Sequence, residues 1–178
     1  MGTAPKDATH HTRAANAPVA LGFDPADFDR AGHGLIAQLP GGKVETPFGV
    51  VFDQSRYDFI QQGSTNPDTV HPSLWRQAQL NGIHGLFEVA PNIWQARGYD
   101  ISNITFIAGD TGWIIVDPLT VEPCAKACLD LANAQLGERP VVAVIYTHSH
   151  TDHFGGVLGV TTQDDVDAGR CRIIAPEH

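Results

Sequence analysis

The sequence predicts an α/β fold, in which helices pack on a β-sheet, behind a lead segment of short helices. Two observations support this prediction. From Leu86 onward, four short runs rich in β-branched and aromatic residues are separated by turn residues: LFEV, NIWQAR, NITFIAG and GWIIVDP. A helical segment ended by Gly137 then leads into another apolar run, VVAVIY, so that strand, helix and strand form a crossover unit. We therefore expect residues 1–85 to form the lead segment and residues 86–178 the α/β unit.

The lead segment contains few strong signals. Residues 1 to about 20 are polar and rich in alanine, so we expect a loose arm in which His10–His11 has no role. DPADFDRAGHG begins with Asp24 as an N-cap followed by proline, which predicts a short helix. ETPFGVVFD is typical of extended chain, and HPSLWRQAQLNG predicts a second short helix that ends at Asn81.

The α/β unit is expected to contain doubly covered strands and one long helix. Residues 114–116 are continuously apolar, as in a strand that is buried on both faces. The helix is expected from about Val121 to Leu136. Within it Cys124, Cys128 and Leu131 follow the i, i+4, i+7 spacing of a buried stripe, so we interpret both cysteines as core residues. Three cysteines in the chain do not make a disulfide framework.

Composition excludes several classes of protein. The formal net charge of −9 argues against non-specific nucleic-acid binding, which needs a basic face. An anionic substrate stays possible, because bound metal ions can reverse the local field. The longest apolar run is far too short for a membrane span. The first residues contain no apolar signal-peptide core, so we expect a cytoplasmic protein, or a periplasmic or secreted one if the start is incomplete.

The motif YTHSHTDHFGG, which follows the apolar run, predicts a metal site. Functional residues of α/β folds gather at the carboxyl ends of strands. In extended chain residues i and i+2 point the same way, so His148 and His150 can face one metal ion. Asp152 and His153 can face a second ion after the chain turns. Imidazole and carboxylate ligands together favour zinc.

The residues after the motif are expected to open a helix. Asp152 is a good N-cap for a helix through Val157 and Leu158. Gly155 and Gly156 have no side chains, so the backbone can approach its neighbours closely there.

This ligand set predicts metal-assisted hydrolysis. Two zinc ions can share a water molecule and lower its pKa toward neutrality, which produces a hydroxide nucleophile. Asp152 is the candidate catalytic residue, because a carboxylate beside that water can orient it and accept its proton.

The motif resembles the HxHxDH signature of the metallo-β-lactamase superfamily at every defining position. Asp117, which closes GWIIVDP, is similar to the superfamily aspartate that supports the metal loop from behind the ligands. The alternative is that Asp117 is an N-cap or turn residue before Pro118.

Three longer segments resemble the alkyl sulfatases of this superfamily: NPDTVHPSLWRQAQLNGIHGLFEV, DISNITFIAGDTGWIIVDPLT and LGERPVVAVIYTHSHTDHFGGVLGV. The resemblance implies zinc-dependent hydrolysis of alkyl sulfate esters, such as dodecyl sulfate, by a metal-bound hydroxide with two zinc ions. It also implies that residues 86–178 are the first half of a metallo-β-lactamase-like αββα sandwich, behind a lead segment specific to the family.

Family members are several times longer, and the further zinc ligands, the other half of the sandwich, a dimerisation domain and a lipid-carrier-like domain lie in the part not matched here. We therefore expect this chain to be an N-terminal portion that is inactive alone, with a homodimer only for the full-length parent. Terminal His178 is taken as incidental. The alternatives are another hydrolase of the superfamily, a thioesterase or lactonase, and a non-enzymatic remnant.

Overall fold

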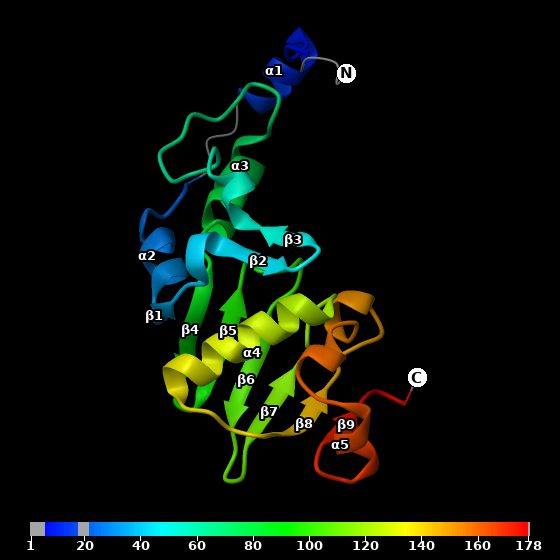
Figure 1. Cartoon of the computed structure of the whole chain (residues 1–178). Helices are drawn as coiled ribbons and strands as arrows, with labels where there is room; N and C mark the ends of the chain where they lie inside the picture. Colours follow the sequence, from blue (N-terminus) through cyan, green and yellow to red (C-terminus); the bar gives the residue numbers. More distant parts are fainter. Residues whose placement is uncertain (1–5, 18–21, 178) are drawn as a thin grey trace.

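The protein is described by a computed structural model that covers residues 6–17 and 22–177 (Figure 1). A seven-stranded sheet has the order β1-β4-β5-β6-β7-β8-β9, and β2 and β3 form a separate hairpin. The strands are β1 (Leu35–Ala37), β2 (Lys43–Thr46), β3 (Gly49–Asp53), β4 (Gly85–Ala90), β5 (Ile93–Arg97), β6 (Ile104–Ala108), β7 (Trp113–Val116), β8 (Val141–Ile145) and β9 (Arg172–Ile174). The α-helices are α1 (His10–Asn16), α2 (Ala26–Gly32), α3 (Pro72–Asn81), α4 (Glu122–Leu136) and α5 (Gln163–Asp167).

The sheet is antiparallel from β1 to β7 and parallel from β7 to β9. The change of direction occurs where α4 crosses over between β7 and β8, as the sequence predicts. Because β7 and β8 are parallel neighbours, with Val116 beside Ile145, their carboxyl ends meet at one edge of the sheet. The candidate metal motif begins at that edge.

The core lies between the sheet and α4 (Figure 1). The alternate residues Ile104 and Phe106 of β6 and Trp113 and Ile115 of β7 are fully buried on this side. Cys124 and Cys128 of α4 are also buried and free, which confirms their interpretation as core residues. The indole Nε1 of Trp113 donates to Oδ1 of Asn133 over 2.7 Å, so the one polar atom of that side chain is satisfied.

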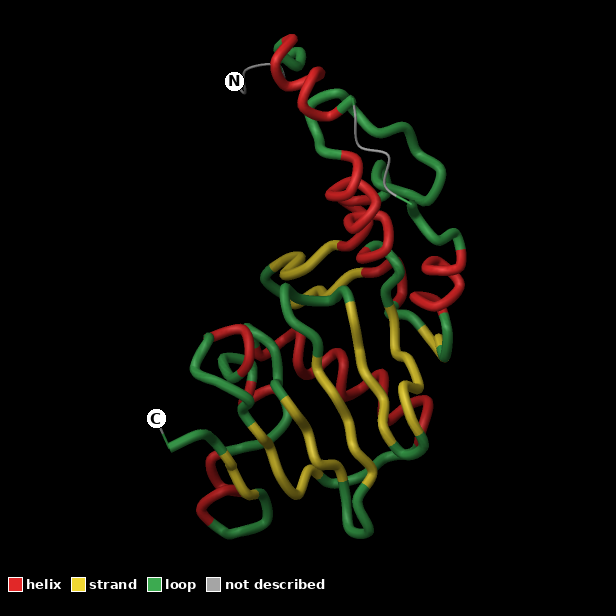
Figure 2. Tube along the Cα trace, turned by 180° about the vertical axis from the view of Figure 1, so that it is seen from behind, coloured by secondary structure: helices red, strands yellow, loops and turns green. Residues whose placement is uncertain are grey.

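The opposite face of the sheet is turned toward the viewer in Figure 2, and no helix of the described residues lies across it. The alternate residues Thr105, Ile114 and Val116 are only partly buried. The doubly covered strands expected from the continuous apolar run are therefore covered on one face within the described part of the chain.

The lead segment joins the same core. Strand β1 pairs with β4 at the sheet edge, and Val44 of β2 is buried against α4. The guanidinium of Arg76 in α3 lies over the rings of Phe23 and Phe28 and pairs with Asp27 at 2.6 Å. The division at residue 85 stays a prediction, although elements on either side of it share one sheet.

The expected loose arm is wrong for residues 10–16, which form α1. The Thr9 hydroxyl accepts from the Thr12 amide as an N-cap, and Arg13 pairs with Asp68 at 3.0 Å. The local capping signal outweighs the polar composition here. The rest of the expected arm lies partly outside the described residues. No described helix is long and apolar enough to span a membrane.

Candidate metal centre

The three histidines of the motif lie together in the loop that follows β8. The ring centroid of His148 is 4.6 Å from that of His150 and 4.1 Å from that of His153. Asp152 Oδ2 is 3.1 Å from His153 Nε2. The structure therefore gathers all four predicted ligands, with His148 between the other two rings. His148 and His150 are exposed, whereas Asp152 and His153 are partly buried.

Asp117 anchors this loop from the end of β7. Its carboxylate accepts from the amide of Thr147 at 2.8 Å, from the hydroxyl of Thr147 at 2.7 Å and from Nδ1 of His153 at 2.8 Å. The Asp117 side chain is 12% exposed. It caps no helix, because the N-cap position of α4 is Val121. The geometry is that of a carboxylate that orients one of the predicted ligand histidines from behind.

These hydrogen bonds determine where protons lie on two of the imidazoles. An ionised carboxylate only accepts, so Nδ1 of His153 carries the proton. The hydroxyl of Thr147 gives its proton to Asp117 and accepts one from Nδ1 of His148, 2.9 Å away. Nε2 of each ring is therefore the nitrogen that can bind a metal. At His153 this atom faces the carboxylate of Asp152, and two acceptors 3.1 Å apart need a cation, either a proton or a metal ion.

The donor types fit zinc, but the described side chains do not converge on one point. No group of three or more His, Cys, Asp or Glu side chains is arranged to hold a metal ion within residues 6–17 and 22–177. Catalytic zinc takes about three protein ligands. The chemistry of the motif is thus appropriate, while a complete coordination set is not formed by these residues as they stand.

The helix expected after Asp152 is wrong. The chain instead makes two short 3₁₀ turns, η3 (Thr151–His153) and η4 (Val157–Gly159), and Asp152 caps neither. The expected close approach is present. A Cβ on Gly155 would overlap the carbonyl oxygen of Thr120, and one on Gly156 would overlap that of Pro118. Glycines that favour such contact also disfavour a regular helix.

Comparison with known proteins shows which proteins this chain is similar to. A family model described as "Metallo-beta-lactamase superfamily" matches residues 97–178. A linear primary-alkylsulfatase of Pseudomonas sp. is 50% identical over 175 residues, which is 96% of this chain and 26% of the relative. An alkyl/aryl-sulfatase BDS1 of Saccharomyces cerevisiae is 46% identical over 96% of this chain and 27% of its own length.

A solved structure of an alkylsulfatase has a similar fold over the matched residues. The stereoselective inverting sec-alkylsulfatase Pisa1 from Pseudomonas sp. superposes with a TM-score of 0.86 at 45% identity, over 94% of this chain and 27% of that chain. The chain is homologous to these alkylsulfatases, and its second half matches the metallo-β-lactamase superfamily. It spans about a quarter of the length of these relatives. The resemblance in the sequence and the metallo-β-lactamase-like α/β fold are both confirmed.

Two contacts of this site were not predicted from the sequence. Thr147 connects Asp117 to His148, and its place directly before the first histidine could have indicated a role. Ser102, in the loop between β5 and β6, donates its hydroxyl to the backbone carbonyl of Asp152. Fifty residues separate these partners, so no local pattern reveals the contact.

An apolar cavity of about 450 Å³ adjoins the imidazole of His148. Its lining consists of aromatic, small and loop residues next to the first histidine: Tyr146, Thr147, His148, Ser149, Phe154, Ala175 and Pro176. The rings of Tyr146 and Phe154 are 5.9 Å apart between centroids. Apolar space is therefore available beside the ring of His148.

Proposed function

We propose that this chain contributes the metal-binding motif of a zinc-dependent hydrolase of alkyl sulfate esters. In this proposal His148 and His150 bind one ion, and Asp152 and His153 bind a second. Asp117 orients His153 directly and His148 through Thr147. The observation that carries it is the hydrogen-bond network of Asp117, which leaves Nε2 of His153 facing Asp152 at 3.1 Å. Fixing a ligand imidazole through its other nitrogen is the usual arrangement in protein zinc sites.

Bound zinc would lower the pKa of a coordinated water toward neutrality and place positive charge beside the substrate. Within this chain, Asp152 would handle the proton of the water. Asp152 accepts the proton of the attacking water at a carboxylate oxygen, since a carboxylate within hydrogen-bond reach can act as a general base. Water and the ester then give an alcohol and hydrogen sulfate.

The substrate class follows from the relatives and the site. Three relatives, identical at 45–50% over 96% of the chain, are named as alkylsulfatases or an alkyl/aryl-sulfatase. The cavity beside His148 supports an apolar substituent on the ester. The carboxylates of Asp117 and Asp152 would repel a sulfate group, so binding of an anionic substrate here would need a bound cation.

The proposal is tested in a chimera. The matching segment of the Pseudomonas linear primary-alkylsulfatase is replaced by residues of this chain, and release of sulfate from dodecyl sulfate is measured. We expect turnover that disappears in the chimera with His148→Ala and His150→Ala. In a second chimera Asp152→Asn should keep the fold and lose at least a hundredfold in kcat, because general-base catalysis contributes about 10²–10⁴-fold.

The competing functions give different results in the same chimera. A thioesterase or lactonase would hydrolyse those esters and leave dodecyl sulfate intact. A folded chimera without zinc and without any hydrolysis would instead support a non-enzymatic segment and contradict the proposal.

A further inference from the structure

The loop between β5 and β6 reaches three separate parts of the molecule. The hydroxyl of Tyr99 accepts from the amide of Leu39 at 2.8 Å and so contacts the lead segment. Asp100 contacts the loop before α4, and Ser102 contacts the metal motif. Tyr99 is 1% exposed and Ser102 8%, so these contacts are shielded from water.

Ser102 holds the middle of the η3 turn. The amides of His153 and Phe154 donate to the carbonyls of His150 and Thr151, which leaves the carbonyl of Asp152 outside the turn's own pattern. In the part of the chain that the structure describes, the hydroxyl of Ser102 is the hydrogen-bond donor to that carbonyl. Removing this hydroxyl would leave the carbonyl of Asp152 without that hydrogen-bond partner. The carboxylate of the same residue lies 3.1 Å from Nε2 of His153.

Asp100 supports the same turn from its other end. Its carboxylate accepts from the Thr120 amide at 3.0 Å and from the Thr120 hydroxyl at 2.6 Å. Gly155 packs directly against the carbonyl of Thr120, since a Cβ on Gly155 would overlap it. One loop thus holds Asp152 directly and Gly155 through Thr120.

We infer that Ser102 and Asp100 are positioning residues for the metal motif. They hold the backbone of residues 152–155 so that the carboxylate of Asp152 and Nε2 of His153 face each other. Their effect on metal binding rests on the proposed function, whereas their effect on the order of the η3 turn does not. Neither residue lies among the predicted ligands, so both act through the backbone.

The main variant is Ser102→Ala in the full 178-residue chain, with two measurements. Zinc affinity is measured by competition with a chromophoric chelator, and we expect it to fall about tenfold or more, as for other partners that orient ligands. Amide hydrogen exchange is measured by mass spectrometry on the metal-free chain, and we expect faster exchange confined to residues 150–156. Ser102→Thr keeps the hydroxyl and should restore both values.

Ser64→Ala is the matched control, because it removes a serine–carbonyl hydrogen bond, to Gln61 at 2.6 Å, outside the motif. It should leave both measurements unchanged. Thr120→Val removes the hydroxyl bond to Asp100 without changing the size of the side chain, and should accelerate exchange in the same segment if Ser102→Ala fails to fold.

Three results would overturn the inference. They are wild-type exchange in residues 150–156 of Ser102→Ala, exchange that rises evenly over the whole sheet, and failure of Ser102→Thr to restore the segment. If neither the unaltered chain nor the chimera with the Pseudomonas alkylsulfatase binds zinc, the proposed metal centre is wrong, and the exchange measurement alone decides whether Ser102 positions the turn.

Discussion

Nδ1 of His153 donates to Oδ2 of Asp117 over 2.8 Å, although the two residues are 36 positions apart in the chain. The bond is possible because β7 and β8 are parallel neighbours that end at the same edge of the sheet. It connects the crossover topology directly to the orientation of His153, one of the proposed ligands. The backbone conformation of the aspartate is also unusual, since Asp117 has a φ of 55°, in the left-handed region.

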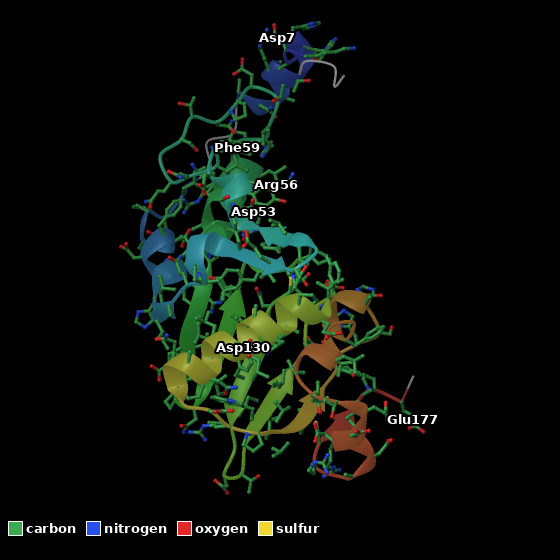
Figure 3. The ribbon with its side chains drawn as sticks, in the orientation of Figure 1. Asp7, Asp53, Arg56, Phe59, Asp130 and Glu177 are labelled. Atoms are coloured by element: carbon green, nitrogen blue, oxygen red, sulfur yellow. The ribbon has the colours of Figure 1, made fainter. Side chains whose placement is uncertain are left out.

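The first prediction is that Asp117→Asn weakens zinc binding by about 10–100-fold, the usual cost of losing a partner that orients a ligand. The asparagine side chain has one oxygen acceptor in place of two, so it cannot keep all the hydrogen bonds from Thr147 and His153. Asparagine does tolerate the left-handed backbone, so the fold should be kept. Chelator competition measures the affinity. The matched control is Asp130→Asn on the surface of α4 (Figure 3), where the aspartate pairs with Lys126. Equal affinities of the two variants would contradict the role of Asp117.

The second prediction concerns the first ion. The double variant His148→Ala, His150→Ala should lose bound zinc relative to the unaltered chain, measured by elemental analysis after dialysis. Each ion needs several protein ligands, and these two are the predicted donors of one ion. His10→Ala with His11→Ala is the control, because it removes an adjacent pair of imidazoles in α1, with centroids 3.7 Å apart. The assignment is wrong if both double variants retain the same zinc content.

The third prediction concerns the close approach at Gly156. Its φ is −86°, so alanine meets no backbone strain, but a Cβ would overlap the carbonyl of Pro118 and crowd Val121 and Ala125. We expect Gly156→Ala to lower the free energy of unfolding by about 1–3 kcal/mol, the usual cost of overpacking. Urea denaturation measures it. Gly32→Ala in α2 is the control, since it has no neighbour within 4 Å and should be neutral or slightly stabilising. A similar midpoint for both variants would refute the packing argument.

The sequence predicts those helices whose ends are marked by local signals, such as proline at the start or glycine after the last residue. α3 begins at Pro72 and ends at Asn81 before a glycine, and α4 ends at Leu136 before Gly137, as the local signals indicate. The motif was predictable for the same reason, because its spacing and its place after an apolar strand are local. The turns after Asp152 were not, since Gly155 and Gly156 are needed for contacts with a distant loop.

Long-range contacts mark the limit of what the sequence could predict. Strand β1 has three residues and gains its place only by pairing with β4, about fifty positions later. Ser102 is an ordinary loop serine until the fold brings it to the carbonyl of Asp152. Neither position carries a pattern of its own, so tertiary structure alone reveals them.

The fourth prediction is a loss of stability in mild acid that depends on His84. Burial lowers the pKa of His84, and the nearby charge of Asp58 opposes this only in part. Nδ1 of His84 lies 3.2 Å from the Tyr99 hydroxyl, which also accepts from the Leu39 amide. The unfolded chain therefore binds a proton more readily than the folded chain does. The stability that neutral His84 contributes is complete above the ordinary histidine pKa of about 6.5. It is lost as the pH falls toward the lower pKa of His84 in the folded chain.

The measurement is urea denaturation of the unaltered chain and His84→Gln between about pH 7.5 and 5. Glutamine cannot take up the proton, so the stability of the variant should change less with pH over this range. His33→Gln, at an exposed position, is the control and should keep the pH dependence of the unaltered chain. Identical slopes for all three proteins would show that His84 is not the group responsible.

The last prediction is that residues 1–178, expressed alone and supplied with zinc, do not release sulfate from dodecyl sulfate, whereas the chimera with the Pseudomonas alkylsulfatase does. The reason is the number of donors. A catalytic zinc ion takes about three protein ligands and keeps one position open for water. Within the described residues no group of three or more such side chains is arranged around a common point, and each proposed ion has two predicted ligands. Asp164, Asp165 and Asp167 do not complete the set, because they lie in α5, where Asp165 bonds to Thr162 and Arg170. Zinc-dependent sulfate release by the 178-residue chain that is abolished by His150→Ala would show that these residues are sufficient and that the donor count is wrong.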